Sequence, residues 1–387
     1  MTGVPAVFEI AGVPRDYAWG STTAIQSLLG LVPDGRPLAE LWFGGHPDSP
    51  SPALSSTLDE LIAADPVALL GQETVEQFGP RLPFLLKVLA ADKALSIQVH
   101  PTIAQAQIGF AAEDAAGLPR DAPNRNYRDP NHKPELICAV TPFEALCGFR
   151  PVAETLDTLA EFGLDGLAPV VALLQGPDPL QRAFTYLLTL QDPAPLVHAV
   201  TARAAELDGL GAARAVLLAA ADFPGDVGVA LALLLNYLKL APGEAIFLGA
   251  GNVHAYLRGL GIEIMANSDN VLRCGLTPKH IDVPELLKVT DFTELAAPRW
   301  PAQTRGGSGR FQVPVPDFAL AWMDVTATEQ PLYRGLPQIV LCTDGTAQVN
   351  AGGRSMSLAP GGAAFVAASA TTQVSGSGRV FVASIGI

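Results

Sequence analysis

The residue pattern changes twice along the chain, from strand-like to helix-like and back to strand-like. This order constrains the fold more than any other feature of the sequence. Residues 1 to about 150 contain short apolar segments separated by proline and glycine, such as Phe84 to Ala90, a pattern typical of strands joined by turns. From about Val152 to Lys239 the sequence is rich in alanine and leucine at helical spacing, and strand-like segments return from Leu240. This order predicts a mainly β protein with a helical insert.

A short internal repeat indicates that the two strand-rich parts are related. The tetrapeptide Leu-Ala-Pro-Gly occurs at 240–243 and again at 358–361, and Phe247 and Phe365 follow at the same spacing. We therefore predict two cupin-like jelly-roll barrels plus an α-helical domain. The predicted division is a catalytic cupin-like β-barrel from residues 1–150 and 240–290, a helical insert domain from 151–239, and a C-terminal cupin-like β-barrel without metal from 291–387.

Two local patterns give more specific expectations. The segment from Ala111 to Asn131 is polar and rich in proline, aspartate and asparagine, which predicts a long loop between strands, and long loops often carry function. Asp344 and Gly345 separate two alternating apolar segments, which is a strong hairpin signal.

Charge and composition limit the possible partners. The 387 residues carry a formal net charge of -14, which disfavours nucleic acid and anionic membranes, because both require a basic surface. The longest apolar run, Val227 to Leu238, is shorter than the ~20 residues needed to span a bilayer. With no signal-peptide pattern and four cysteines without CxxC spacing, we expect a cytoplasmic protein that is a monomer or weak homo-oligomer.

Three clusters of polar residues lie on predicted strands. Because alternate residues of a strand share a face, the polar side chains that point the same way are Ser96, Gln98 and His100, then Lys133 and Glu135, then His254 and Tyr256. A single histidine on a strand is more often a hydrogen-bonded core residue than a ligand. Three such clusters together favour a shared polar site.

These clusters contain a plausible set of metal ligands. Two nitrogen donors and two oxygen donors come from Gln98, His100, Glu135 and His254. Zinc accepts histidine and carboxylate readily, an amide oxygen is less usual, and a set without cysteine is typical of an open, catalytic site. Iron, manganese or cobalt would fit almost as well by ligand type.

A basic pair lies near the end of the last cluster. Arg273 and Lys279 are six residues apart beside a predicted turn, so they could hold a phosphate, the arginine as a planar fork and the lysine as a point charge. A solvated turn with unrelated charges is the alternative, because isolated basic pairs are common on surfaces.

Several of these segments resemble the signature segments of the type I phosphomannose isomerases. The similar segments occur in family order and are Tyr17 to Gly20, Ala39 to Gly44, Lys93 to Pro101, Asn131 to Glu135, Gly251 to Leu257 and Asn267 to Lys279. The resemblance is specific between about residues 17 and 290 and weak in the helical insert and the C-terminal part. Cys274 departs from it, because a glycine or alanine is expected beside Arg273.

The resemblance implies a function and a site. It implies an isomerase that interconverts mannose 6-phosphate and fructose 6-phosphate by zinc-assisted proton transfer between C1 and C2 through a cis-enediol. It implies one Zn²⁺ per chain, held by Gln98, His100, Glu135 and His254, and Arg273 as the catalytic arginine. It also implies a substrate site lined by Ser96, Lys133, Tyr256, Glu263 and Lys279.

Some alternatives stay open at this stage. Glu263 and Lys133 are both candidates for the catalytic base by residue type, and Lys87 and Lys93 add positive charge near the first metal strand. Another metal-dependent cupin enzyme, such as a non-haem iron oxygenase, would use two histidines and one carboxylate. A non-catalytic sugar-binding cupin would need no group that stabilises an enediolate.

The repeat also predicts that the second barrel binds no metal. When Leu240 is aligned with Leu358, His254 falls on Thr372, and residues 362–373 contain no His, Asp, Glu or Cys. Zinc and iron sites need such donors.

Overall fold

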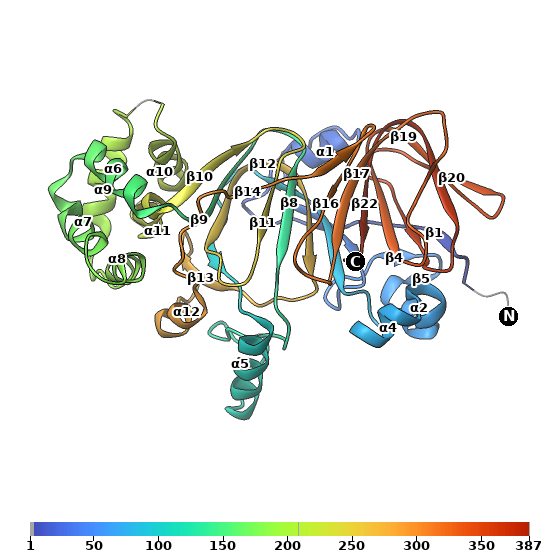
Figure 1. Cartoon of the computed structure of the whole chain (residues 1–387), viewed down its shortest axis with the longest axis horizontal. Helices are drawn as coiled ribbons and strands as arrows, with labels where there is room; N and C mark the ends of the chain where they lie inside the picture. The colour runs from blue at the N-terminus through green and yellow to red at the C-terminus, as the bar shows by residue number, and fades with distance from the viewer. Residues whose placement is uncertain (1–3, 208, 387) are drawn as a thin grey trace.

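The computed structural model describes residues 4–207 and 209–386. Its β-structure forms two sheets of eleven strands each, which lie side by side along the long axis (Figure 1). The first sheet comprises β2 (Val13–Arg15), β3 (Glu40–Gly44), β6 (Phe84–Ala91), β7 (Ile97–Val99), β8 (Glu135–Ala139), β9 (Phe143–Phe149), β10 (Leu235–Leu240), β11 (Ala245–Leu248), β12 (His254–Ala266), β13 (Leu272–Gly275) and β14 (Arg299–Trp300).

The second sheet contains most of the C-terminal strands together with three strands from the beginning of the chain. Its members are β1 (Val7–Ile10), β4 (Pro52–Ala53), β5 (Ser56–Thr57), β15 (Gln303–Arg305), β16 (Ser308–Phe311), β17 (Ala319–Val325), β18 (Gln330–Pro331), β19 (Gln338–Ala351), β20 (Arg354–Leu358), β21 (Ala363–Val366) and β22 (Thr372–Ser384). The predicted division assigns residues 1–150 to the first barrel, but β1 pairs antiparallel with β21, and β4 and β5 extend this pairing, so these strands belong to the other sheet. Conversely, β14 falls in the predicted second barrel but pairs with β11 of the first sheet.

The helices lie mainly at one end and along the lower edge of the molecule in Figure 1. They are α1 (Ala24–Leu28), α2 (Leu58–Ala64), α3 (Pro66–Leu70), α4 (Gln72–Phe78), α5 (Ile103–Ala115), α6 (Val152–Phe162), α7 (Ala168–Leu174), α8 (Pro179–Leu188), α9 (Ala194–Ala204), α10 (Gly211–Asp222), α11 (Gly228–Leu231) and α12 (Val283–Val289), with 3₁₀ turns at Asp165–Leu167 and Ala232–Leu234. Within the described residues, none of these helices combines the length and apolarity that crossing a bilayer requires.

The helical run predicted between 151 and 239 ends earlier than expected. Helices α6 to α11 follow the alanine- and leucine-rich sequence, and their apolar faces join a core that also contains Ile97 and Val253 of the first sheet. Residues Leu235 to Leu240 instead form β10, which pairs with β9. The edge of a sheet is available beside them, so their apolar alternation is satisfied by strand pairing rather than by helix packing.

The loop predicted from Ala111 to Asn131 is wrong in its first part. Helix α5 continues to Ala115, and an irregular segment follows. The helix begins with a capping box, in which Gln105 N donates to Thr102 Oγ1 at 3.2 Å and Thr102 N donates to Gln105 Oε1 at 2.9 Å. This cap satisfies two otherwise unpaired groups at the helix start.

The internal repeat occupies equivalent places in the two sheets. Gly243 N donates to Ala139 O and Gly361 N donates to Cys342 O, both at 2.8 Å, and both glycines have positive φ, 90° and 83°. Each turn leads into a four-residue strand, β11 or β21, and then into a thirteen-residue strand, β12 or β22. His254 and Thr372 are the first residues of these long strands, as the sequence alignment predicts.

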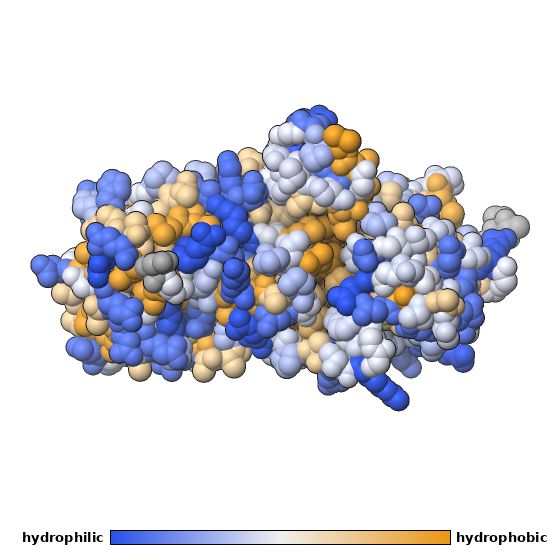
Figure 2. Space-filling view, turned by 90° about the horizontal axis from the view of Figure 1, so that it is seen from above, coloured by the Kyte–Doolittle hydropathy of each residue, from blue (hydrophilic) through white to orange (hydrophobic). Residues whose placement is uncertain are grey.

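Apolar cores fill the spaces around both sheets. One core lies where the sheets adjoin and includes Phe43, Leu86 and Phe365, and another lies within the second sheet and includes Val340, Val374 and Val380. Figure 2 looks down on the face that carries α1 and shows an apolar band across the middle of the molecule, with mainly hydrophilic side chains toward both ends. The buried residues of the first sheet also include the ionisable side chains of Lys87, Glu135 and Glu263.

Candidate metal centre and active site

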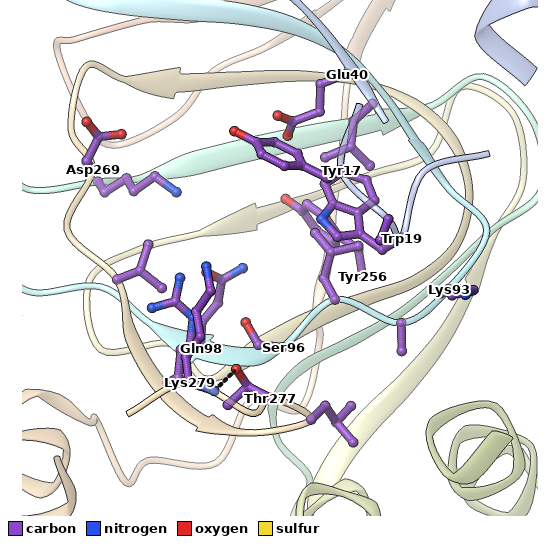
Figure 3. Close-up of a pocket in the computed structure, with 18 of the residues that line it drawn as sticks. Tyr17, Trp19, Glu40, Lys93, Ser96, Gln98, Tyr256, Asp269, Thr277 and Lys279 are labelled. Atoms are coloured by element: carbon purple, nitrogen blue, oxygen red, sulfur yellow. Dashed lines mark hydrogen bonds between the residues drawn. The ribbon is translucent and has the colours of Figure 1, made fainter. Parts of the chain in front are cut away.

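A cavity of about 870 Å³ opens into the first sheet and gathers most of the predicted site residues. Figure 3 shows that they come from several segments, with Asp269 and Glu40 toward one end and Lys279, Thr277 and Ser96 toward the other. The predicted residues that line this cavity are Ser96, Gln98, Lys133, Glu135, Tyr256, Glu263, Arg273 and Lys279. His100 and His254 are fully buried and do not line it.

Three buried side chains converge beside this cavity as a possible metal centre. His100 follows β7, Glu135 begins β8 and His254 begins β12, so strand pairing brings together residues that are far apart in sequence. Each residue offers one ligand atom, and these atoms all lie within 4.8 Å of one another. The Nε2 atoms of both histidines are 3.4 Å from a carboxylate oxygen of Glu135.

The backbone orients both imidazole rings. The Nδ1 atom of His100 is 2.7 Å from Asn270 O, and that of His254 is 2.9 Å from Asn252 O. A carbonyl oxygen only accepts, so each Nδ1 carries the proton and each Nε2 presents its lone pair toward Glu135. This is the usual way in which proteins orient histidine ligands of metals.

The ligand atoms themselves have no hydrogen-bond partner among the described residues. Nε2 of His100, Nε2 of His254 and Oε2 of Glu135 are all buried and unpaired. Each such group costs about 1–3 kcal/mol when it is buried without compensation. Three acceptor atoms facing one another are therefore compensated only by a shared cation, and the donor set of two imidazoles and one carboxylate suits zinc.

Burial and neighbouring charges shift the pKa values of these groups. Burial lowers the pKa of His100 to about 4, and the Lys133 ammonium adds to this effect, which favours the neutral form that a metal requires. Burial raises the pKa of Glu135, but Lys133 and then His100 outweigh it and hold the pKa well below its usual range. Lys133 Nζ donates to Glu135 Oε1 at 2.6 Å.

Gln98, the predicted fourth ligand, is a direct neighbour of the centre. It pairs with His254 across one edge of β7 and with Arg273 across the other. Its side chain lines the cavity. Its coordination of a metal stays a prediction, since only its position in the sheet and along the cavity wall supports it.

A buried charge network extends along the opposite wall. Lys87 Nζ lies 3.1 Å from Glu263 Oε2 and 3.4 Å from Glu40 Oε1, and Trp42 Nε1 donates to Glu40 Oε2 at 2.7 Å. Strand pairing explains the arrangement, because Lys87 on β6 is the register partner of Glu263 on β12 and of Trp42 on β3. The sequence pointed to Lys87 only as a nearby positive charge, since its two partners are distant in sequence.

Tyr256 adds an unpaired hydroxyl to the cavity wall. Its side chain is buried, and its hydroxyl has no hydrogen-bond partner within the described part of the chain. Burial and the nearby Glu263 raise the pKa of this phenol well above its usual range, so it stays protonated. A protonated hydroxyl at this position can donate to a bound polar molecule.

A second group of potential metal ligands, His46, Asp48 and Asp269, has a different character. Asp48 N donates to Nδ1 of His46 at 3.2 Å, so the neutral ring carries its proton on Nε2, which faces Asp269 Oδ1 at 3.5 Å. A protonated nitrogen is not a ligand. His46 and Asp269 therefore form an internal polar pair, and Asp269 lies at the cavity wall.

The position in the second sheet that corresponds to His254 holds no donor cluster. Thr372 is 3% exposed and its Oγ1 is unpaired among the described residues, and its strand partner on β19 is Ala351. Both groups of potential ligands found in residues 4–207 and 209–386 belong to the first sheet and its connections.

Comparison with known proteins connects this site to a family. The catalytic domain of type I phosphomannose isomerases matches residues 7–152. The mannose-6-phosphate isomerase of Escherichia coli is 42% identical over 379 residues, which cover 95% of this chain and 96% of that protein, and the enzyme of Rattus norvegicus is 34% identical, with 95% of each chain covered. The crystal structure of the Salmonella typhimurium enzyme bound to fructose 6-phosphate and zinc superimposes with a TM-score of 0.92 at 38% identity, covering 99% of this chain and all of that one. This chain therefore belongs to the type I phosphomannose isomerase family.

Proposed function

We propose that this chain is a zinc-dependent isomerase that interconverts mannose 6-phosphate and fructose 6-phosphate. The observation that carries the proposal is the unpaired, buried ligand cluster of His100, Glu135 and His254 beside a large polar cavity. The mannose-6-phosphate isomerase that covers nearly the whole chain at 42% identity, and the relative bound to fructose 6-phosphate and zinc, support the choice of reaction and metal.

In this proposal one zinc ion is held by His100, Glu135 and His254, with Gln98 as the fourth protein ligand. When bound, zinc polarises an oxygen of the open-chain sugar and orients the substrate. Lys133 binds Glu135 at 2.6 Å and compensates the charge of this carboxylate, which keeps it ionised inside the protein.

The proposed reaction moves a proton between C1 and C2 through a cis-enediol, and Glu263 is the proposed base. Its carboxylate lines the cavity, is buried, and has a pKa raised by burial, partly offset by Lys87. A carboxylate of raised pKa is a stronger base than an exposed one. Lys133 is less suitable because its ammonium is already engaged as a donor to Glu135.

The remaining site residues bind and stabilise the substrate in this proposal. Arg273 lies on β13 beside Gln98, so its guanidinium can stabilise negative charge that develops on the substrate oxygens. Tyr256 donates its free hydroxyl to the sugar. Ser96 and Lys279 line the end of the cavity away from Glu40 and Asp269, where the phosphate binds.

We also propose that the two sheets are related cupin-like barrels and that the units follow the predicted boundaries, apart from strands β1, β4, β5, β10 and β14. The matching turns at Gly243 and Gly361, and the equal strand lengths that follow them, support this relation. In this arrangement only the first barrel is catalytic.

A coupled assay tests the function directly. Formation of fructose 6-phosphate from mannose 6-phosphate is measured with purified protein, before and after prolonged chelation and then after addition of zinc. We expect activity to disappear with the metal and to return with zinc. Full activity in rigorously metal-free protein would refute the role given to the ligand cluster, whereas inactivity of the zinc-loaded protein would refute the reaction itself.

A further inference from the structure

Three cationic side chains line one part of the cavity, and one of them comes from outside the segments that carry the other site residues. Arg273 lies on β13 and Lys279 lies shortly after this strand. Arg128 instead belongs to the irregular segment that follows α5, residues 116–134. We call this segment the 116–134 loop and the three residues the cationic cluster. The sequence singled out the loop by its composition but gave Arg128 no role.

The cationic cluster lacks compensating carboxylates. Burial and Arg128 lower the pKa of Arg273, and Arg273, burial and Arg128 lower the pKa of Lys279. No salt bridge joins Arg128, Arg273 or Lys279 to an acidic side chain among the residues described. Three like charges that repel one another at a cavity wall are stabilised when an anion binds between them.

The backbone of Arg128 is held firmly although its side chain is exposed. Arg128 N donates to Asn270 Oδ1 at 2.7 Å, and Asn270 Nδ2 donates to Asp129 O and Asn131 O, both at 2.7 Å. The same Asn270 contributes the carbonyl oxygen that orients His100. Asn270, a buried residue, therefore orients the His100 ring of the metal centre and also holds the backbone from which the Arg128 side chain extends.

The preceding part of the loop is anchored as well. Arg125 is buried and donates to Tyr127 O and to Asp114, and Tyr127 OH donates to Glu285 of α12 at 2.7 Å. Asn126 Nδ2 donates to Asp282 Oδ2 at 2.9 Å. The loop thus holds the backbone of Arg128 at the cavity between two fixed points, so the backbone needs no further ordering when the guanidinium binds a ligand.

We propose that Arg128 is a substrate-binding residue that contacts the phosphate group of the sugar phosphate, opposite Lys279. This inference rests on the proposed function for the identity of the substrate. A guanidinium forms two parallel hydrogen bonds with a phosphate. The net charge of -14 makes such a local cluster necessary, because the overall field of the protein repels a dianion.

Substitution of Arg128 provides the test, with the zinc-loaded full chain throughout. Arg128→Gln removes the charge, Arg128→Lys keeps it, and Arg120→Gln is the matched control, since Arg120 lies in the same loop, is exposed and does not line the cavity. For each protein, kcat and KM for mannose 6-phosphate are measured, together with the dissociation constant of inorganic phosphate by calorimetry.

We expect Arg128→Gln to raise both KM and the phosphate dissociation constant by about tenfold or more, the range of a charge-assisted hydrogen bond, while kcat changes by less than about twofold. Arg128→Lys should recover part of the loss, and Arg120→Gln should behave as the unsubstituted chain. Equal constants in the two Gln variants would overturn the proposal, as would a fall in kcat at constant KM.

Two outcomes separate this inference from the proposed function. If the unsubstituted chain fails to isomerise mannose 6-phosphate, the reaction is wrong, yet the phosphate titration still measures whether Arg128 binds the anion. If the chain isomerises the sugar but phosphate binding does not depend on Arg128, only the role of Arg128 is wrong.

Discussion

Lys87 illustrates how charge is arranged within the site. Burial lowers the pKa of this lysine, but Glu40 and Glu263 outweigh burial and raise it above its usual range. The ammonium therefore remains charged at any physiological pH and keeps a fixed positive charge next to Glu263. When Glu263 returns its proton to the substrate, it becomes a carboxylate again. The Lys87 ammonium compensates this buried negative charge.

Replacement of Glu263 tests its role as the base. Glu263→Gln should lower kcat by about 10²–10⁴-fold, the usual contribution of general base catalysis, with a small change in KM. Glu40→Gln removes a carboxylate from the same lysine but leaves the base, so its loss should be much smaller. Exchange of the C2 proton of the substrate with deuterated water, followed by NMR, measures the step. Similar losses in both variants would argue that Glu263 acts only as a charge partner.

Arg273 should affect the chemical step more than binding. If its guanidinium stabilises charge that is present mainly in the transition state, Arg273→Ala lowers kcat by about 10²–10³-fold, and KM rises far less. Steady-state kinetics on mannose 6-phosphate give both constants. A normal kcat with a raised KM would instead place Arg273 with Arg128 as a residue that only binds the phosphate.

The sequence predicted the site residues that alternate along a single strand, but not the contacts between strands. Ser96, Gln98 and His100 could be found because period-two alternation assigns them to one face. The pairing of Lys87 with Glu263 depends on register across β6 and β12, and the role of Asn270 depends on a loop residue 142 positions away. Neither leaves a local pattern in the sequence, so both appear only in the folded chain.

Among the elements, strand β12 links the metal centre to the base. Its first residue is His254, paired with β7 and β9, and its later half pairs with β6 and β8 and carries Glu263. Gly259 lies between the halves with a φ of 121°, and a Cβ there would lie 2.7 Å from Pro142 O. Only glycine fits this close approach without strain.

Asn270 should control the position of the 116–134 loop. Asn270→Asp keeps the two backbone bonds that its Oδ1 accepts but replaces the donating amide with a carboxylate that faces the carbonyls of Asp129 and Asn131. Two lost bonds and this repulsion should reduce the free energy of unfolding by about 2–4 kcal/mol. Urea unfolding measures the change, and unchanged stability would mean that the loop is not held through this residue.

The Asp-Gly pair at 344–345 marked an unusual backbone position but did not distinguish a hairpin turn from a bulge. Asp344 and Gly345 predicted a hairpin, whereas the structure shows one continuous strand, β19, with a register shift between Cys342 and Asp344. Bulges and tight turns both use glycine at positive φ, and Gly345 has a φ of 70°. Sequence therefore identifies the unusual backbone position, while only the neighbouring β22 decides that the strand continues.

At the scale of the whole molecule, the two sheets share a plan but differ in one decisive position. The first has His254 where the second has Thr372, a buried residue with no imidazole or carboxylate donor. This difference could be predicted from the sequence, because both the repeat and the absence of His, Asp, Glu and Cys from residues 362–373 are visible there. The crossing of β1 to the second sheet was not predictable, because nothing within Val7 to Ile10 indicates a partner at the other end of the chain.

The asymmetry predicts the metal content. Elemental analysis of pure protein should give close to one zinc per chain, and His254→Ala should lower this value toward zero, because it removes one of the two imidazole donors and leaves the tetrahedral set incomplete. Thr372→Ala is the matched substitution in the second sheet and should leave the zinc content unchanged. Two zinc ions per chain, with one retained in the His254 variant, would place a second site in the other sheet.

The pairing of β1 with β21 has a consequence for synthesis on the ribosome. Val7 and Val366 are register partners although they are roughly 360 residues apart in sequence, and such non-local contacts form slowly. At the usual rate of elongation, β21 emerges on the order of tens of seconds after β1. During this interval Phe8, which is buried in the finished protein, lacks its register partner Phe365, although Ile10 can already pair with Ala53 of β4. The nascent chain therefore exposes an apolar strand for most of its translation, and slower translation prolongs that exposure.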